Sequence, residues 1–101
     1  MKSKLILVTI FLLVGILKAD QFKIVYRSGE SIYNVSYSKV QIKNNEDRVL
    51  FQGYTDKYGR ITISLQNGNY QGRVYYRKRW WKVDFPVDGT PSLRRIQISP
   101  E

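Results

Sequence analysis

The stretch T-D-K-Y-G-R-I-T-I-S-L-Q-N-G-N-Y, residues 55–70, decides the fold class. Asp56 can accept hydrogen bonds from nearby backbone N–H groups, and Gly59 supplies the positive φ that closes such a turn. Asn67-Gly68 is a strong short-range signal for a β-hairpin. Two turns that bracket a short segment predict a strand between them, with a further strand on each side.

The segment between the two turns alternates strictly between apolar and polar side chains. Its apolar residues fall on one face of the predicted strand: Ile61, Ile63 and Leu65. A period of two is typical of a strand that packs one face on a core, and no window of the chain has the spacing of a long amphipathic helix. The same pattern predicts seven strands, over residues 22–26, 39–43, 48–55, 60–65, 70–78, 81–87 and 93–99.

Short strands separated by turn signals, without helices between them, indicate a β-sandwich. We therefore predict an all-β fold, a seven-stranded antiparallel β-sandwich, with a polar loop over residues 27–38. The predicted core consists of the inward-facing side chains of these strands: Val40, Ile42, Phe51, Ile61, Ile63, Leu65, Val74, Tyr76, Trp81, Val83, Phe85, Ile96 and Ile98.

The N-terminus has the layout of a secretory signal peptide. Two lysines precede an apolar run over residues 5–17, which is shorter than the roughly 18 residues of a membrane span, and Ala19 is small enough for a cleavage site. Cleavage there predicts a signal peptide, 1–19, and one mature domain, 20–101, with no stable membrane span. The alternative is an uncleaved N-terminal anchor, because Leu17 is bulky for a cleavage-site position.

The predicted mature domain is basic and contains no cysteine. The chain has 17 basic residues and 8 acidic ones, and three of the basic residues precede position 20, which leaves a net charge of +6. Many small extracellular domains depend on disulfides, and this one has none. Export without cysteine fits a bacterial periplasm or cell surface better than an animal secretory pathway.

The chain also lacks histidine, which narrows its chemistry further. Without Cys and His there is no Cys/His zinc site, no Ser-His-Asp triad and no thiol nucleophile. The acidic residues fall mostly in predicted turns, and the ligand series of an EF-hand loop is absent. We expect a protein that is not an enzyme and that holds no cofactor and no metal.

Within residues 55–70 the chain resembles the carboxypeptidase regulatory-like domain, a member of the transthyretin-like (prealbumin-like) β-sandwiches. The residues that carry the resemblance are Thr55, Asp56, Gly59, Ile61, Ile63, Leu65, Gly68 and Tyr70. The resemblance implies a seven-stranded Greek key, and a non-catalytic accessory or interaction module of an exported protein. In that family the motif residues shape turns and core and perform no chemistry. We expect this domain to stand alone, without the catalytic domain to which members of the family are often attached.

A basic and aromatic segment over residues 73–82 is the candidate binding site. If the fifth and sixth predicted strands pair in register, their outward side chains form one solvent-facing patch. The predicted binding residues are Arg73, Tyr75, Arg77, Arg79, Trp80 and Lys82. Guanidinium groups next to aromatic rings suit planar anionic or sugar-like partners. The same residue types are also ordinary on a solvated strand face, where charge discourages edge-to-edge aggregation.

Two kinds of partner follow for this segment. The first is a protein or an anionic cell-envelope polymer, bound through the basic aromatic face. The second is a carbohydrate whose rings stack on Trp80 and Tyr75. Nucleic acid fits the charge but not the predicted export. The salt dependence of binding distinguishes the first two kinds of partner, because screening weakens contacts between exposed charges and leaves stacking largely intact.

Overall fold

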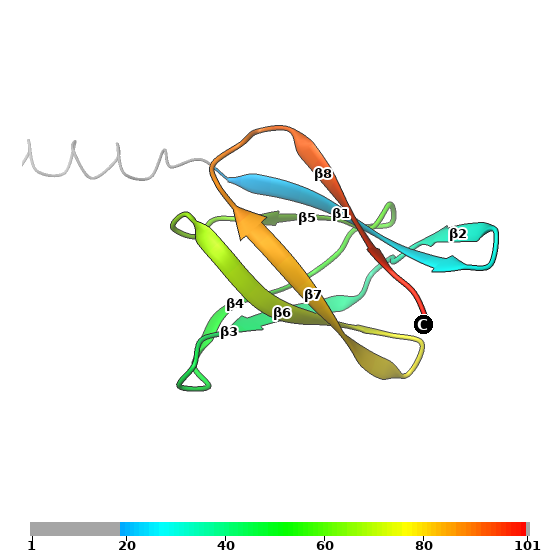
Figure 1. The fold of residues 1–101 in the computed structure, drawn as a ribbon, viewed down its shortest axis with the longest axis horizontal. Helices are drawn as coiled ribbons and strands as arrows, with labels where there is room; N and C mark the ends of the chain where they lie inside the picture. Colours follow the sequence, from blue (N-terminus) through cyan, green and yellow to red (C-terminus); the bar gives the residue numbers. More distant parts are fainter. Residues whose placement is uncertain (1–18, 101) are drawn as a thin grey trace, which may run out of the picture.

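The structure is a computed structural model that describes residues 19–100, so most of the predicted signal peptide lies outside the described residues. The described chain forms strands and no helix (Figure 1), which confirms the all-β class. The strands are β1 (Asp20–Ser28), β2 (Ser31–Asn34), β3 (Lys39–Lys43), β4 (Val49–Tyr54), β5 (Arg60–Ile63), β6 (Gly68–Tyr76), β7 (Arg79–Val87) and β8 (Leu93–Ile98). Between residues 19 and 100 there is no helix of the length and apolarity that crossing a membrane requires.

The prediction of seven strands is wrong, because the region predicted as a polar loop contains an eighth strand. This strand is β2, which pairs with the end of β1 as an antiparallel hairpin, with Ile32 opposite Arg27. Gly29 makes the turn between them with a φ of 64°. All four residues of β2 are exposed, so the strand has no alternating burial that a sequence pattern could show.

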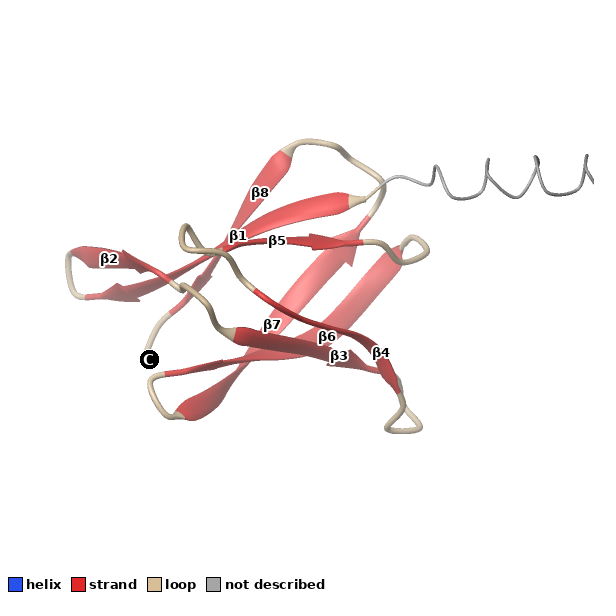
Figure 2. Cartoon of the chain, turned by 180° about the vertical axis from the view of Figure 1, so that it is seen from behind, coloured by secondary structure: helices blue, strands red, loops and turns tan. Residues whose placement is uncertain are grey.

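The strands form two sheets (Figure 2). Sheet A consists of β1 at its centre, with β2, β5 and β8 paired to it, and sheet B has the order β4-β3-β6-β7. Sheet B is antiparallel throughout. In sheet A, β8 runs parallel to β1, so the prediction of purely antiparallel pairing is wrong for this pair. A parallel pair needs a long connection, and here the rest of the domain provides it.

The core lies between the two sheets. The predicted core is confirmed, with most of its members buried and the other four partly buried against them: Phe51, Leu65, Tyr76 and Ile96. The buried hydrophobic residues that the prediction left out are Phe22, Ile24, Val25, Tyr26, Val35 and Val87. The rings of Phe22 and Phe85 meet edge to face across the two sheets, with centroids 5.3 Å apart. Aromatic contacts of this kind contribute beyond the area that they bury.

The second predicted turn is not a hairpin. The chain crosses from sheet A to sheet B between β5 and β6, so Asn67 ends a connection between layers and Gly68 is the first residue of β6. The Tyr70 hydroxyl donates a hydrogen bond of 2.6 Å to the Gln66 carbonyl and holds this crossing in place. The hairpin interpretation failed because β5 pairs with β1, which is far away in the sequence, and β6 pairs with β3 and β7 of the other sheet.

The first predicted turn, Asp56 to Arg60, is confirmed. Gly59 has a φ of 82°, and its N–H donates to the Asp56 carbonyl at 3.0 Å. The Asp56 carboxylate accepts hydrogen bonds from the backbone N–H groups of Tyr58 and Arg60, at 2.8 and 2.9 Å. These bonds, that from Arg60 above all, lower the pKa of Asp56, because they favour the ionised carboxylate.

Candidate functional site

Four of the six predicted binding residues share the outer face of sheet B. In the β6–β7 hairpin Arg73 lies opposite Lys82, and Tyr75 lies opposite Trp80. Their neighbours in the two strands, Val74 and Trp81, are paired and buried in the core, as the alternation requires. The register therefore places two cations and two aromatic rings side by side on the outer surface of one hairpin.

Arg73 is held in a fixed position on this face. Its guanidinium carbon lies 4.0 Å from the centroid of the Trp80 ring, a cation–π contact. Its Nε and Nη2 atoms both donate to the Gln41 Oε1 atom, at 3.1 and 2.9 Å. Gln41 in turn donates to the Gln52 side chain at 2.7 Å. A cation held from two sides loses little freedom when a ligand binds, which favours affinity.

These contacts form a continuous row across sheet B. Gln52 lies opposite Gln41, Gln41 opposite Arg73, and Arg73 opposite Lys82, so one residue from each of β4, β3, β6 and β7 takes part. We call these four residues the Arg73 row. The sequence prediction found its β6 and β7 members and missed both glutamines. Only the register of strands about 30 residues apart brings Gln41 to Arg73, so no local signal could have shown it.

Next to the Arg73 row the surface is hollowed. The hollow has a volume of about 470 Å³, and its charged and polar lining residues are Gln41, Lys43, Asp47, Gln71, Arg73, Lys82 and Asp84. Lys43 and Asp47 form an ion pair of 3.3 Å at one side. The hollow therefore presents cations and amides with a smaller number of carboxylates. Such a lining can bind carboxylate, sulfate or phosphate groups and can hydrogen-bond neighbouring hydroxyls.

The aromatic rings on this face differ in how accessible they are to a ligand. The Tyr75 and Trp80 rings meet edge to face with centroids 5.2 Å apart, and Tyr75 is 44% exposed. Tyr54, at the end of β4, is 65% exposed. Trp80 is half-buried, and the Arg73 guanidinium covers one face of its ring. A sugar that stacked on that face of Trp80 would have to displace Arg73.

Arg77 and Arg79 do not belong to this face, so the prediction of one six-residue patch is wrong. Tyr76 and Arg79 are the last pair of the hairpin, and Arg77 and Lys78 form the two-residue turn, with φ angles of 52° and 63°. In the alternation of β7, Arg79 falls on the same side of the sheet as the buried Trp81, and its guanidinium lies 3.8 Å from the Trp81 ring centroid. A turn of this kind keeps the strands in register, but it directs these cations to the end of the sandwich.

Arg77 lies within a group of tyrosines at that end. Its guanidinium carbon is 4.5 Å from the Tyr26 ring centroid, 5.3 Å from that of Tyr33 and 5.5 Å from that of Tyr76. Hydrogen bonding to the Tyr76 side chain, followed by the charge environment of the tyrosines, raises the pKa of Arg77. Through its contacts with these three rings the guanidinium bridges β1, β2 and the β6–β7 hairpin.

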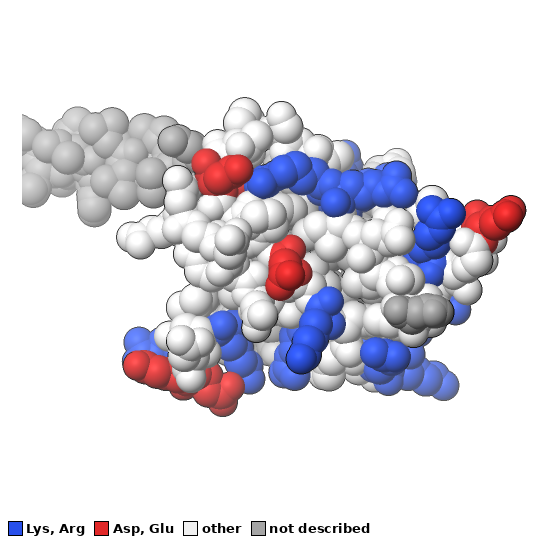
Figure 3. Space-filling view, in the orientation of Figure 1, with Lys and Arg blue, Asp and Glu red and all other residues white. Residues whose placement is uncertain are grey.

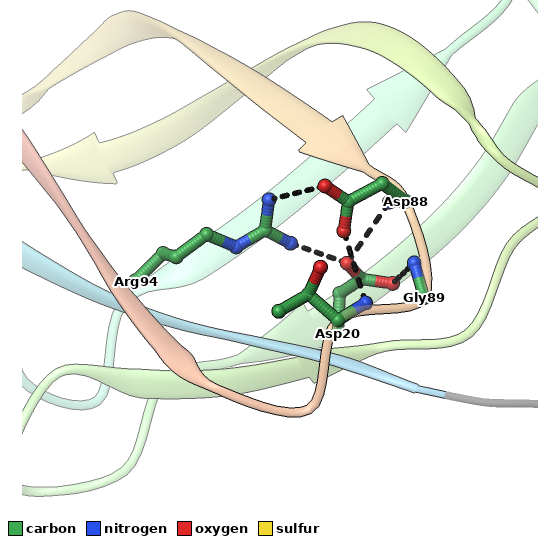
Figure 4. Close-up of polar contacts among 5 residues, drawn as sticks. Asp20, Asp88, Gly89 and Arg94 are labelled. Carbon is green, nitrogen blue, oxygen red and sulfur yellow. Dashed lines mark hydrogen bonds and ion pairs between the residues drawn. The ribbon is translucent and has the colours of Figure 1, made fainter.

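A buried ion pair that the sequence did not predict joins the first and last strands (Figure 4). Asp20 is 1% exposed, and its carboxylate accepts hydrogen bonds from the N–H groups of Asp88 and Gly89, at 3.0 and 3.1 Å. The Arg94 guanidinium contacts both Asp20 and Asp88 and lies over the Phe22 ring. Hydrogen bonds from Thr90 lower the pKa of Asp88. Each carboxylate is held by donors, which makes this a structural contact between strands.

Potential metal ligands are scattered. Among residues 19–100 there is no group of three or more Asp and Glu side chains arranged to hold a metal ion. Comparison with known proteins adds no assignment, since no protein-family model and no curated protein matches the sequence.

Proposed function

We propose that the protein is a small exported, non-catalytic binding module that holds an anionic cell-envelope partner on the outer face of sheet B. The observation that carries the proposal is the position of Arg73. It lies opposite Lys82, is fixed by Gln41 and Trp80, and borders a polar hollow. Two adjacent cations held in this way repel one another, and an anionic ligand relieves that repulsion.

The arrangement favours an anionic group over the stacking of a neutral sugar. Arg73 occupies one face of Trp80, which is the ring best suited to stacking. Carbohydrate binding remains the second candidate, and what favours it is the exposure of Tyr75 and Tyr54 on the same side of the sheet. The two functions make opposite demands on Arg73, because an anionic ligand needs the guanidinium and a stacked sugar needs it removed from the ring.

The proposal also includes the export of the protein and its relation to a family of β-sandwich domains. Asp20 begins β1, so cleavage after Ala19 leaves every strand of the domain intact. We place the mature module in a bacterial periplasm or outside the cell. The two-layer all-β fold and the turn at Asp56 support a relation to the carboxypeptidase regulatory-like domains and the transthyretin-like Greek key. The parallel pairing of β1 with β8 is the feature of this chain that such a relation has to accommodate.

The test compares an acidic glycan with a neutral one. We expect the purified protein to bind fluorescently labelled polygalacturonate and to bind it more weakly as salt rises, because salt screens exposed charges. The double variant Arg73→Gln/Lys82→Gln should bind at least about tenfold more weakly, at roughly 1 kcal/mol per cation. Its free energy of unfolding should fall by no more than about 2 kcal/mol, because half-buried Arg73 loses its contacts with Trp80 and Gln41 while Lys82 is exposed.

The matched control is Arg48→Gln/Lys78→Gln, which removes the same charge from exposed positions outside the Arg73 row. This control should keep nearly all of the affinity. Equal weakening in both double variants would mean that net charge alone attracts the polymer, and it would overturn the proposed site. Binding of neutral dextran that persists in high salt and is lost in Tyr75→Ala would favour the carbohydrate function.

A further inference from the structure

The outer face of sheet A carries a second set of cations, which the sequence did not single out. Phe22 and Ile24 of β1 point into the core, so Lys23 points outward. Lys23 lies opposite Arg60 of β5 and also opposite Arg95 of β8. Three positive side chains therefore form one row across three neighbouring strands, and we call it the Lys23 row.

This row has little compensating charge. Arg60 pairs with Asp56 at 2.9 Å, but among residues 19–100 no ion pair includes Lys23 or Arg95. Like charges directly opposite one another on adjacent strands destabilise a sheet.

The Lys23 row also lies beside Val25, which is 2% exposed although it points to the outer face. The stems of long side chains can cover an apolar residue in this way and leave their charges in water.

Polar residues that can hydrogen-bond flank the Lys23 row, together with the apolar Val25 and the exposed Leu93, which lies opposite Gln21. The next pairs along the strands bring Gln21 opposite Thr62, and Val25 opposite both Asn34 and Gln97. Cations next to amides also make up the Arg73 row and its hollow on the opposite sheet, where Asp47 and Asp84 add two carboxylates. Figure 3 shows Lys and Arg both in the upper part of the molecule, over β8 and β1, and in the lower part, over sheet B.

We propose that the outer face of sheet A is a second binding surface for an acidic glycan, so that one domain bridges two glycan chains. The second surface stands on its own geometry, and the bridging rests on the proposed function of sheet B. The cations lie across the strands at the inter-strand spacing of about 4.8 Å. A row of that kind fits a linear polymer with repeated carboxylates or sulfates, whose hydroxyls the flanking amides can bind.

The first experiment counts sites with a short oligogalacturonate by isothermal titration calorimetry. The wild-type protein should bind two oligomers, and Lys23→Gln/Arg95→Gln should bind one. The variant Arg73→Gln/Lys82→Gln should also retain one site, and Arg48→Gln/Lys78→Gln should retain both. Circular dichroism and thermal unfolding of each variant show that the domain still folds, and a loss of affinity counts only in folded protein.

The possible failures of the two proposals are distinguishable. One wild-type site that is abolished by Arg73→Gln/Lys82→Gln overturns the second surface and leaves the proposed function intact. One wild-type site that is abolished by Lys23→Gln/Arg95→Gln overturns the proposed function and the bridging, and supports the sheet A surface. A polyphosphate of equal charge should bind several-fold more weakly than the glycan, because it lacks hydroxyls for the amides. Equal binding would overturn the choice of a glycan.

A second experiment tests bridging directly. Long polygalacturonate mixed with wild-type protein should become turbid at intermediate ratios and clear when protein is in excess, as expected for a bivalent cross-linker. Neither Lys23→Gln/Arg95→Gln nor Arg73→Gln/Lys82→Gln should produce turbidity, although each should still bind the polymer. Turbidity that persists in Lys23→Gln/Arg95→Gln would overturn the bridging.

Discussion

Two turns of this molecule make the same hydrogen bonds with different residues. One turn runs from Asn44 to Arg48 and the other from Asp56 to Arg60. In each, the side chain of the first residue accepts hydrogen bonds from the backbone N–H groups of the third and fifth residues. In both turns the first and fifth residues share a backbone hydrogen bond, and the fourth has a left-handed φ. That fourth residue is Asp47 in one turn, with a φ of 62°, and Gly59 in the other, with a φ of 82°.

The difference shows that packing, more than backbone conformation, requires the glycine. A Cβ atom at position 59 would lie 2.5 Å from the Ile24 carbonyl oxygen and 3.2 Å from the Val35 nitrogen. Gly59 also accepts a hydrogen bond from the Ile24 N–H at 2.8 Å, which fixes the turn against β1. Asp47 is exposed at the end of the β3–β4 hairpin and pairs with Lys43. Aspartate is one of the few residues that tolerate this conformation in the open.

The largest expected effect comes from placing the residue of one turn in the other. Gly59→Asp should lower the free energy of unfolding by at least about 3 kcal/mol, because the clash adds to the left-handed strain. Urea unfolding followed by circular dichroism measures the loss. A loss below about 1 kcal/mol would show that β1 can move away from the turn, and that φ alone selects glycine here.

A smaller effect should separate the two turns by pH, because Asp56 can ionise and Asn44 cannot. The folded state lowers the pKa of Asp56 below its usual 3.8, mainly through the bond from the Arg60 N–H. The ionised carboxylate therefore stabilises the protein fully above that value, and this contribution is lost as the pH falls below it. Asp56→Asn should keep the turn and weaken the loss of stability in acid. Parallel stability curves for variant and wild type from pH 6 to pH 2 would contradict this origin.

The smallest effect should come from the reciprocal exchange. Asp47→Gly relieves a left-handed side chain, but it adds backbone entropy to the unfolded state and removes a surface ion pair. These contributions are of similar size, so we expect a net change within about 0.5 kcal/mol. Thermal unfolding of Asp47→Gly and Gly59→Asp in parallel measures the difference between the two turns. A loss of stability above about 2 kcal/mol in Asp47→Gly would contradict that difference.

The two turns also mark what the sequence could predict of the fold. The turn at Asp56 and the inward parity of the strands depend on neighbouring residues, and both predictions were right. The strand β2 shows no alternation because both its faces are exposed, so its residues looked like a loop. Asn67-Gly68 has the composition of a hairpin, but the pairing of Asp20 with Ile63 commits the preceding strand to the other sheet.

The candidate site was predictable where it depended on one hairpin. Because Arg77 and Lys78 form a two-residue turn, the alternation continues across it and places Arg73 beside Lys82. The prediction could not show that Arg77 lies among tyrosines, since Tyr26 and Tyr33 come from the other sheet. Gln41 and the whole Lys23 row were missed for the same reason, because strand pairing distant in sequence creates them.

The parallel pair formed by β1 and β8 has a mechanical consequence. The chain enters this ladder at Asp20 and leaves it at Ile98, which are at opposite ends of the paired strands. Tension applied between residues 19 and 100 therefore pulls the strands past one another and stretches their hydrogen bonds together instead of opening them in succession. The ion pair of Arg94 with Asp20 joins the same two strands and resists the same sliding. The domain should therefore resist extension between these two residues more strongly than a domain whose terminal strands separate one hydrogen bond at a time.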